Sequence, residues 1–449
     1  MSNVSQVLQA KPSVESHPPT LRSITLPLPG LDGTRGLLEF VARNDLHTWF
    51  QRGDGFVGFG EVARFTAQGP SRFEDAQAWW QAVIERSENQ VMTEDDVAGT
   101  GLMSFGSFSF SKMSSFESRL IVPEVVVGSR HGKSWVTYIT ADDGDLTRAS
   151  AEDMLARYLD DPSETRERSM GDELVGGKLT EEQWKTAVAR GVAHIHAGEL
   201  TKLVLARDVL ARLTEPIDTA GVLRELAVRY QDCWTYSVDG LIGSTPEMLI
   251  KVENNSAQAR VLAGTLDRSD APDNDPSYPE RILAGSQKQQ HEHQIAIDSL
   301  TRQLEPFTAS MTSHSEPFVL QLPNVWHLAS DVTAELAPDD DGCLPTSLAL
   351  VGALHPTAAV CGTPTRVAGE LIRELEHMDR GPYAGPVGWM DARGNGEWGI
   401  ALRGAVIEDP THIRLYAGCG IVDASVPEAE LAETWSKFRP MIEALGLPY

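Results

Sequence analysis

The segment from Pro427 to Lys437 constrains the fold more than any other, because it predicts a helix with two different faces. Glu430, Glu433 and Lys437 follow one another at spacings of three and four residues, so they share one stripe of the helix surface. A separate apolar stripe, suited to packing on a core, is formed by Leu431, Trp435, Phe438 and Ile442. The sequence therefore predicts a packed helix that also presents two carboxylates and an ammonium group.

A second predicted helix carries another acid. The polar stretch Ser286–His293 contains Glu292. Together with Glu430 and Glu433 it supplies three carboxylates on two helices, and carboxylate oxygens are the ligands that Mg²⁺ prefers in proteins. A magnesium-dependent active site is therefore the first functional hypothesis.

The charge of the chain limits its partners. A net charge of -26 repels phosphate backbones and anionic membranes, so we expect neither nucleic acid nor a membrane as a partner. An anionic substrate would need a local cation. Residues 1–20 lack the apolar run of a secretory signal, and no apolar run approaches the length of a membrane span. The four cysteines are scattered, which fits a reducing cytoplasm and argues against a structural zinc site.

Local patterns predict the remaining organisation. Residues 1–20 read as a disordered tail, and residues 160–178 read as a polar linker. The clearest helix covers Glu181–Ala197, where Thr180 and Gln183 form a capping-box pattern. A further helix is predicted at Phe73–Ser87. Strands are predicted at Val122–Val127, Ser134–Ile139, Lys202–Leu210, Met248–Val252, Pro386–Met390 and Glu397–Val406.

Lys202 and Glu247 each have two interpretations. In a strand, Lys202 shares a face with Val204, and an apolar setting disfavours the charged amine, so this lysine could act as a general base. Alternatively, it is a strand-end lysine whose amine reaches water. Glu247 follows Pro246 just before a strand, where an acid is either a functional group or a simple turn residue.

Arg403 lies in the predicted strand Glu397–Val406, on a face shared with Gly399, Ala401 and Ala405. Small neighbours leave room for a ligand above the guanidinium, whose planar fork suits a carboxylate; the alternative is an internal salt bridge. Gly394–Gly399 matches the GxGxxG pattern, but a strand follows it instead of a helix, so the dinucleotide motif is rejected. Asn395 and Gly396 predict a hairpin turn there.

Two glycine-containing strand ends, Ala263–Thr265 and Tyr416–Ile421, let backbone amides approach a ligand closely, or form ordinary turns. His327, beside Trp326, is either a satisfied core histidine or a site residue.

In their order along the chain, these segments resemble the chorismate-utilising enzymes, which include anthranilate, aminodeoxychorismate, salicylate and isochorismate synthases. The resemblance covers about residues 178–440. It rests on the motifs Lys202–Arg207, Ser244–Leu249, Ala263–Thr265, Ser286–His293, His327–Ser330, Asp379–Trp389, Arg403, Ala417–Val422 and Glu430–Lys437. The segment His355–Pro364 is similar to the isochorismate synthase version, whereas anthranilate and aminodeoxychorismate synthases usually carry Gly-Ala-Pro-Lys at its end.

The resemblance implies an α/β fold in which large antiparallel sheets pack together with helices outside. It implies one domain over residues 21–449, with N-terminal strands and helices over 21–177 and a catalytic region over 178–449. It further implies an isomerase that converts chorismate to isochorismate with Mg²⁺, as a cytoplasmic monomer without a glutaminase partner. A salicylate synthase that also eliminates pyruvate is the alternative enzyme, and an inactive chorismate-binding protein is the alternative class. Both menaquinone and siderophore synthesis could use the product.

The resemblance also implies a role for each site residue. Lys202 would activate water for attack at C2, and Glu247 would protonate the departing hydroxyl group at C4. Magnesium would be bound by Glu292 and Glu433, with Glu430 in support. The enolpyruvyl carboxylate would be held by Tyr383, Arg403 and the N–H of Gly418. The ring pocket would be shaped by Gly264, Thr265, His327 and Lys437. Gln289 replaces an acid that many relatives carry, which affects the surroundings of the metal.

Overall fold

The structure is a computed structural model, and it describes residues 18–28, 33–93, 97–141, 146–159, 171–268, 275, 277–313, 317–323 and 325–448. The side chains of Thr265 and Glu292 lie outside this description, although both residues belong to described elements. The predicted disordered tail lies outside it as far as residue 17. Among the described residues, no helix is long and apolar enough to cross a membrane.

The larger of two sheets has 13 strands in the described part of the chain. Its order across the sheet is β10 (Glu173–Gly176), β11 (Lys202–Arg212), β23 (His412–Ile421), β22 (Gly404–Asp409), β13 (Leu241–Thr245), β12 (Trp234–Val238), β2 (His47–Gln51), β3 (Asp54–Phe59), β8 (Val125–Arg130), β9 (Lys133–Thr140), β1 (Arg22–Pro27) and β5 (Glu88–Val91), while β19 (Gly362–Thr363) pairs with β11. The edge strand β10 lies inside the stretch that was expected to be a linker.

The second sheet has 10 strands among the described residues. Its order is β16 (Thr308–Ser313), β18 (Val325–Leu336), β15 (Ser256–Asp267), β14 (Met248–Glu253), β21 (Gly396–Ile400), β20 (Pro386–Asp391), β6 (Met103–Ser107), β7 (Ser118–Val122) and β4 (Ala63–Ala67), while β17 (Phe318–Gln321) pairs with β18. Among the described strand pairs, only β1 and β5 run parallel. The predicted large antiparallel sheets are therefore confirmed, and both contain strands from the N-terminal and C-terminal regions.

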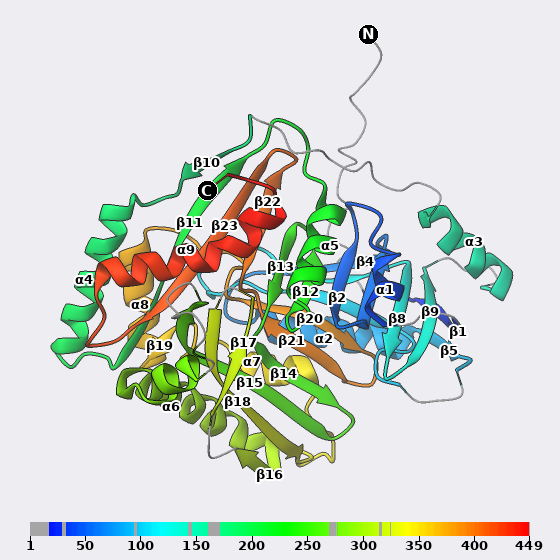
Figure 1. Ribbon diagram of the computed structural model, residues 1–449. Coiled ribbons are helices and arrows are strands. Elements are labelled where there is room, and N and C mark those ends of the chain that lie inside the picture. Colours follow the sequence, from blue (N-terminus) through cyan, green and yellow to red (C-terminus); the bar gives the residue numbers. More distant parts are fainter. Residues whose placement is uncertain are drawn as a thin grey trace.

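Helices lie around these sheets, and Figure 1 shows α9 lying along the strands β11, β22 and β23. The α-helices are α1 (Gly33–Leu38), α2 (Arg72–Arg86), α3 (Arg148–Leu159), α4 (Glu181–His196), α5 (Thr219–Arg229), α6 (Gln287–Leu304), α7 (Ser347–Leu354), α8 (Thr365–Glu376) and α9 (Pro427–Ala444). Two short helical turns flank α6, at Glu280–Ala284 and Glu305–Phe307.

The helix predicted from the capping-box pattern is present as α4. Thr180 accepts a hydrogen bond from the backbone of Gln183, whose side chain in turn accepts one from the backbone of Thr180. The indole of Trp184 is fully buried and donates to the carbonyl of Ala206 at 3.0 Å. Local sequence therefore starts the helix, and one buried tryptophan fixes it to β11.

Two predicted strands are wrong in the same way, because each crosses from one sheet to the other. Val122–Val127 is divided at Pro123 between β7 of the second sheet and β8 of the first. Proline lacks the N–H that would continue the ladder. Glu397–Val406 is divided between β21 and β22, and Arg403 lies in the break with a left-handed backbone at φ 48°. A third crossing, between β13 and β14, contains Glu247.

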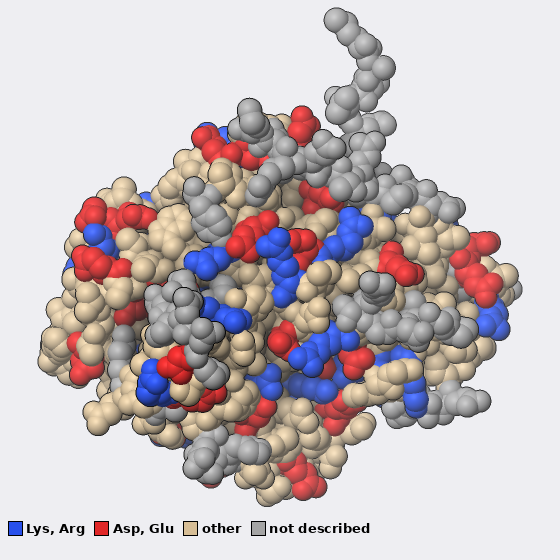
Figure 2. Space-filling view, in the orientation of Figure 1, with Lys and Arg blue, Asp and Glu red and all other residues tan. Residues whose placement is uncertain are grey.

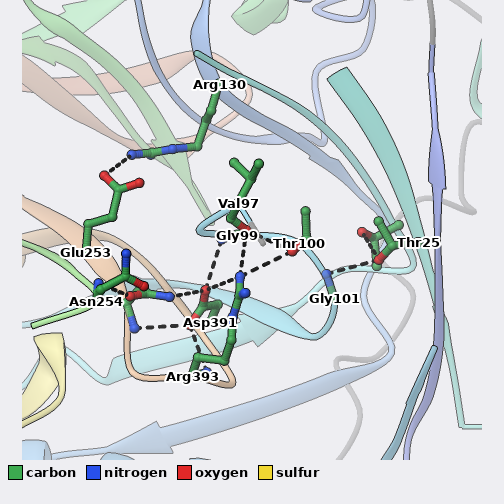
Figure 3. Close-up of polar contacts among 12 residues, drawn as sticks. Thr25, Val97, Gly99, Thr100, Gly101, Arg130, Glu253, Asn254, Asp391 and Arg393 are labelled. Carbon is green, nitrogen blue, oxygen red and sulfur yellow. Dashed lines mark hydrogen bonds and ion pairs between the residues drawn. The ribbon is translucent and has the colours of Figure 1, made fainter. Parts of the chain in front are cut away.

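The predicted hairpin is present as β20 and β21, but its turn lies before Gly396, which already pairs with Met390. Figure 3 shows the hydrogen bonds that hold this turn around Asp391. The Asp391 carboxylate is fully buried and accepts from the backbone N–H groups of Gly99, Arg393 and Asn395 and from the Asn395 side chain, all at 2.8–3.0 Å. One carboxylate thus joins the hairpin to the loop before β6.

Asp391→Ala should therefore destabilise the fold. It removes the acceptor of several buried N–H groups, and such a loss costs about 2–4 kcal/mol in free energy of unfolding. The measurement is the urea midpoint of the variant against that of Asp409→Ala, which removes an exposed acid at the end of β22 that also accepts two backbone N–H groups. A midpoint for Asp391→Ala as high as that of the control would contradict the assigned role.

Candidate active site

A cavity lies where the two sheets meet under α9. It encloses about 700 Å³ of space, part of which is open solvent. The predicted site residues on its wall are Glu247, Gly264, His327, Tyr383, Arg403, Gly418, Glu433 and Lys437. They come from distant parts of the chain, and the fold brings them together around one space.

Glu247 is the acid at the crossing between β13 and β14. Its side chain is buried, and its backbone is fixed by bonds to the Thr245 hydroxyl at 3.2 Å and from the Ile400 N–H at 3.1 Å. Burial raises the pKa of Glu247 to about 8, although the charges of Lys202, Lys437 and Arg403 act in the opposite direction. Glu247 is therefore mainly protonated at neutral pH, and although it lies in the bend between two strands, its burial sets it apart from an ordinary surface turn residue.

Lys202 begins β11 and is only 1% exposed, which excludes the interpretation that its amine reaches water. It does not belong to the cavity wall itself, but Val204 on the same strand face does. Its charge is the strongest of those that lower the pKa of Glu247, so the two side chains lie close enough to interact. The structure thus pairs a buried amine with a buried, protonated acid.

Arg403 and His327 meet across the cavity. Nη2 of Arg403 lies 2.8 Å from Nε2 of His327, and Nδ1 of His327 lies 3.2 Å from the carbonyl oxygen of Gly264. An arginine only donates and a carbonyl only accepts, so His327 carries its proton on Nδ1 and accepts at Nε2. Burial and the charges of Arg403 and Lys437 hold the pKa of His327 well below its usual value. His327 is therefore neutral and orients Arg403.

Arg403 forms no ion pair with a carboxylate in the described part of the chain, so the internal salt bridge expected as the alternative is not found there. It is 7% exposed, and burial lowers its pKa from the usual value. A buried cation of this kind favours an anionic ligand. Tyr383 lies on the same wall, where its ring stacks on that of Tyr416 with centroids 5.1 Å apart.

The helix α9 places Glu433 and Lys437 of its polar stripe on the cavity wall, whereas Glu430 is not part of that wall. Nζ of Lys437 donates to Oε1 of Glu433 at 2.6 Å and to the carbonyl oxygen of Gly418 at 2.8 Å. Glu430 lies one turn before Glu433 and is 3% exposed, away from the cavity wall, with its backbone carbonyl near the Cys419 thiol. The apolar stripe packs as predicted, with Phe438 and Ile442 in the core.

The donor atoms suit a hard divalent cation. Glu433 has acceptor capacity beyond its bond to Lys437, because a carboxylate accepts about four hydrogen bonds. Glu430 adds a second carboxylate on the same helix. Within the described side chains no cluster of three metal-binding groups is found, and the side chain of Glu292, the third predicted ligand, lies outside them. Glu430 and Glu433 therefore fit Mg²⁺ chemically as part of an oxygen donor set.

Sequence reasoning missed Arg380, which also lies on the cavity wall. It is 3% exposed and pairs with Glu376 in the last turn of α8. An acid and an arginine four residues apart are common on exposed helices, so the spacing alone did not distinguish this buried pair. Gln289, which was expected to affect the surroundings of the metal, packs against Gly264 on the cavity wall: a Cβ atom added at Gly264 would lie 2.7 Å from Oε1 of Gln289.

Comparisons with known proteins agree with this geometry. A family model described as chorismate binding enzyme matches residues 6–446. Isochorismate synthase DhbC of Bacillus subtilis (strain 168) is 38% identical over 279 residues, which cover 60% of this chain and 69% of that protein. The putative isochorismate synthase MenF of Mycobacterium tuberculosis (strain ATCC 25618 / H37Rv) is 38% identical over 271 residues, covering 58% and 71%.

Solved structures show the same architecture. The putative 2,3-dihydroxybenzoate-specific isochorismate synthase DhbC from Bacillus anthracis superposes with a TM-score of 0.72 at 28% identity, over 92% of this chain and 99% of that one. MenF, the menaquinone-specific isochorismate synthase from Escherichia coli, has a TM-score of 0.75 at 24% identity, over 96% and 95%, and supports the fold alone. On its sequence match and its fold, the chain belongs to the family of chorismate binding enzymes.

Proposed function

We propose that the protein is an isochorismate synthase, an isomerase that converts chorismate to isochorismate by adding water at C2 with loss of the C4 hydroxyl group. The observation that carries this proposal is the pairing of buried Lys202 with protonated Glu247 beside Arg403, a buried cation without a carboxylate partner in the described structure. A binding protein needs the cation but not an acid–base pair. The names of the relatives, isochorismate synthases from several bacteria, support the same activity and do not favour a salicylate synthase.

Binding of the substrate dianion depends on local charge. The whole chain carries -26, so anions are repelled at long range. Inside the cavity, protonated Glu247 contributes no negative charge, and Lys437 offsets Glu433. Arg403 is left to bind a substrate carboxylate with its planar fork, and the Tyr383 hydroxyl can donate a further hydrogen bond. Net attraction for the substrate is therefore confined to the cavity.

The reaction needs a proton removed and a proton supplied. Lys202, as the neutral amine, accepts a proton from the water molecule whose oxygen forms the new bond to C2; after each turnover it releases this proton to solvent, while Glu247 takes one up. Glu247 donates its proton to the hydroxyl group at C4, which leaves as water when the C4–O bond breaks. One water is consumed and one is released, so the formula of the substrate is unchanged. The raised pKa of Glu247 keeps this proton available at neutral pH.

Magnesium would be held by Glu433 and Glu292, with Glu430 in support. When bound, Mg²⁺ supplies positive charge that neutralises a carboxylate of the substrate. The resemblance to the family and the carboxylate donors on α9 support this assignment. A monomer in the cytoplasm, without a glutaminase partner, is part of the same proposal. Relatives are named for 2,3-dihydroxybenzoate and for vibriobactin, and the family resemblance also allows menaquinone synthesis, so a siderophore or a menaquinone route is a candidate consumer of the product.

Incubation with chorismate and Mg²⁺ should give isochorismate without salicylate or pyruvate, as followed by chromatography. Lys202→Ala should abolish the product, because the base that activates water is lost. Excess chelator should stop the wild-type reaction, and added Mg²⁺ should restore it. Lys251→Ala is the matched control, since this lysine lies on β14 and pairs with Glu253. Appreciable product from Lys202→Ala, or full activity with chelator, would contradict the assigned base or metal.

Arg403→Ala should lower kcat/KM by the equivalent of about 2–4 kcal/mol, because it removes the partner of a substrate carboxylate. Arg403→Lys should not recover the loss, since an ammonium group lacks the fork that engages both a carboxylate and His327. Arg260→Ala is the control, because Arg260 pairs with Asp331 on the second sheet. Wild-type kcat/KM in Arg403→Ala would mean that this arginine only supports the fold.

The pH profile should report Glu247. An acid catalyst acts only while protonated, and its pKa of about 8 places the loss of the proton above neutrality. We therefore expect kcat/KM to fall as the pH rises through about 8, and Glu247→Gln to lower activity at every pH by ~10²–10⁴-fold. If the residual activity of Glu247→Gln still falls as the pH rises through about 8, the ionisation belongs to another group.

A further inference from the structure

Glu376 and Arg380 form a buried ion pair behind the cavity wall. Glu376 ends α8, the chain turns at His377 with a left-handed φ of 52°, and Arg380 folds back onto Glu376. The two side chains are 1% and 3% exposed. Nε of Arg380 lies 2.9 Å from Oε2 of Glu376, and Nη2 lies 2.5 Å from Oε1. This is the two-pronged geometry of an arginine–carboxylate pair.

The remaining bonds of the pair reach backbone groups. Nη1 of Arg380 donates to the carbonyl oxygen of Val360, and Nη2 donates to that of Val204, both at 2.9 Å. The backbone N–H of Ala206 donates to Oε1 of Glu376 at 2.7 Å. Four of the five N–H donors of Arg380 are thus engaged by protein acceptors. The guanidinium also lies over the ring of Phe110, 4.3 Å from its centroid.

These backbone groups belong to separate walls of the cavity. Val204 lies on β11, two residues beyond Lys202, and Val360 lies in the segment before β19. The carbonyl of Arg380 itself accepts from the N–H of Tyr383 at 3.0 Å. The guanidinium of Arg380 therefore sets the separation between the strand of the proposed base and the 357–361 segment, and its backbone carbonyl ties the same residue to Tyr383 on the cavity wall.

A buried ion pair is a weak source of stability, because desolvation offsets most of the attraction between the charges. Apolar side chains of similar volume would fill this space as well. However, apolar side chains could not form hydrogen bonds to the carbonyl groups of Val204 and Val360 or to the N–H of Ala206, so they could not fix the positions of these groups. The arrangement is thus suited to fixing geometry more than to stabilising the fold.

We propose that Glu376 and Arg380 are positioning residues for the reaction, which hold the backbone segments of Lys202 and Tyr383 at fixed positions around the cavity. Because four of its five N–H donors are engaged by protein acceptors, Arg380 serves mainly to position backbone groups around the cavity. This inference rests on the proposed function. It predicts that loss of the pair lowers kcat while KM changes little, since a misplaced base slows the chemical step without removing Arg403.

The test replaces the pair by apolar residues, with Arg380→Met and Glu376→Leu combined. We expect kcat to fall by about 10- to 100-fold, the effect of misplacing a reacting group by up to 1 Å, and KM to stay within about threefold. Arg130 and Glu397 supply the matched control, because they form another buried ion pair, 2.8 Å apart, outside the described cavity wall. Arg130→Met combined with Glu397→Leu should leave kcat and KM close to wild type.

Arg380→Lys is measured as well, so that the proposal stays testable if the double variant does not fold. Lysine keeps the charge but cannot bond to Glu376, Val204 and Val360 together, so kcat should again fall at nearly constant KM. Wild-type kcat in either folded variant, a rise in KM alone, or an equal fall of kcat in the control pair would overturn the proposal. A wild-type protein that makes no isochorismate would instead contradict the proposed function.

Discussion

The site depends on strands that leave one sheet and enter the other. β13 continues into β14 and β21 continues into β22, and both passages lie side by side, because β13 pairs with β22 and β14 pairs with β21. Close contact at the bend requires glycine: a Cβ atom on Gly243 would lie 2.7 Å from the Cα of Gly404. The residues at the two bends, Glu247 and Arg403, are released from ladder pairing. Their side chains therefore face the space between the sheets.

Burial then determines the ionisation states of the groups that line this space. In water Glu247 would be ionised and His327 would titrate near neutrality. Burial makes both neutral and leaves the cationic groups to define the charge of the cavity. Arg403 adopts an unusual backbone conformation, which costs on the order of 1 kcal/mol for a residue with a side chain. Its carbonyl accepts from the Ser244 N–H at 3.2 Å, so the neighbouring strand helps to hold the conformation.

Local patterns predicted the parts of the site that local structure builds. The spacing of Glu433 and Lys437 predicted that they share one face of the helix, where they are in contact. The capping-box pattern at Thr180 predicted the start of α4. The same patterns failed where distant strands decide the outcome. The predicted strands ran through Pro123 and through Arg403, although the chain changes sheets at both places. Burial of Lys202 and of the Glu376–Arg380 pair depends on β19, β23 and α8 together, which a pattern within one segment does not contain.

The pairing of β11 with β23 has a consequence for how activity is acquired. These strands lie far apart in the sequence, yet Ala206 and Gly418 are directly opposite each other in the sheet. Closing so long a loop is entropically costly and slow, so this pairing is expected to form late in folding. A partly folded chain can therefore form its helices and hairpins without a cavity. During refolding, enzymatic activity would then return only when the long-range strand pairing is complete. The recovery of activity would therefore report completion of the tertiary structure.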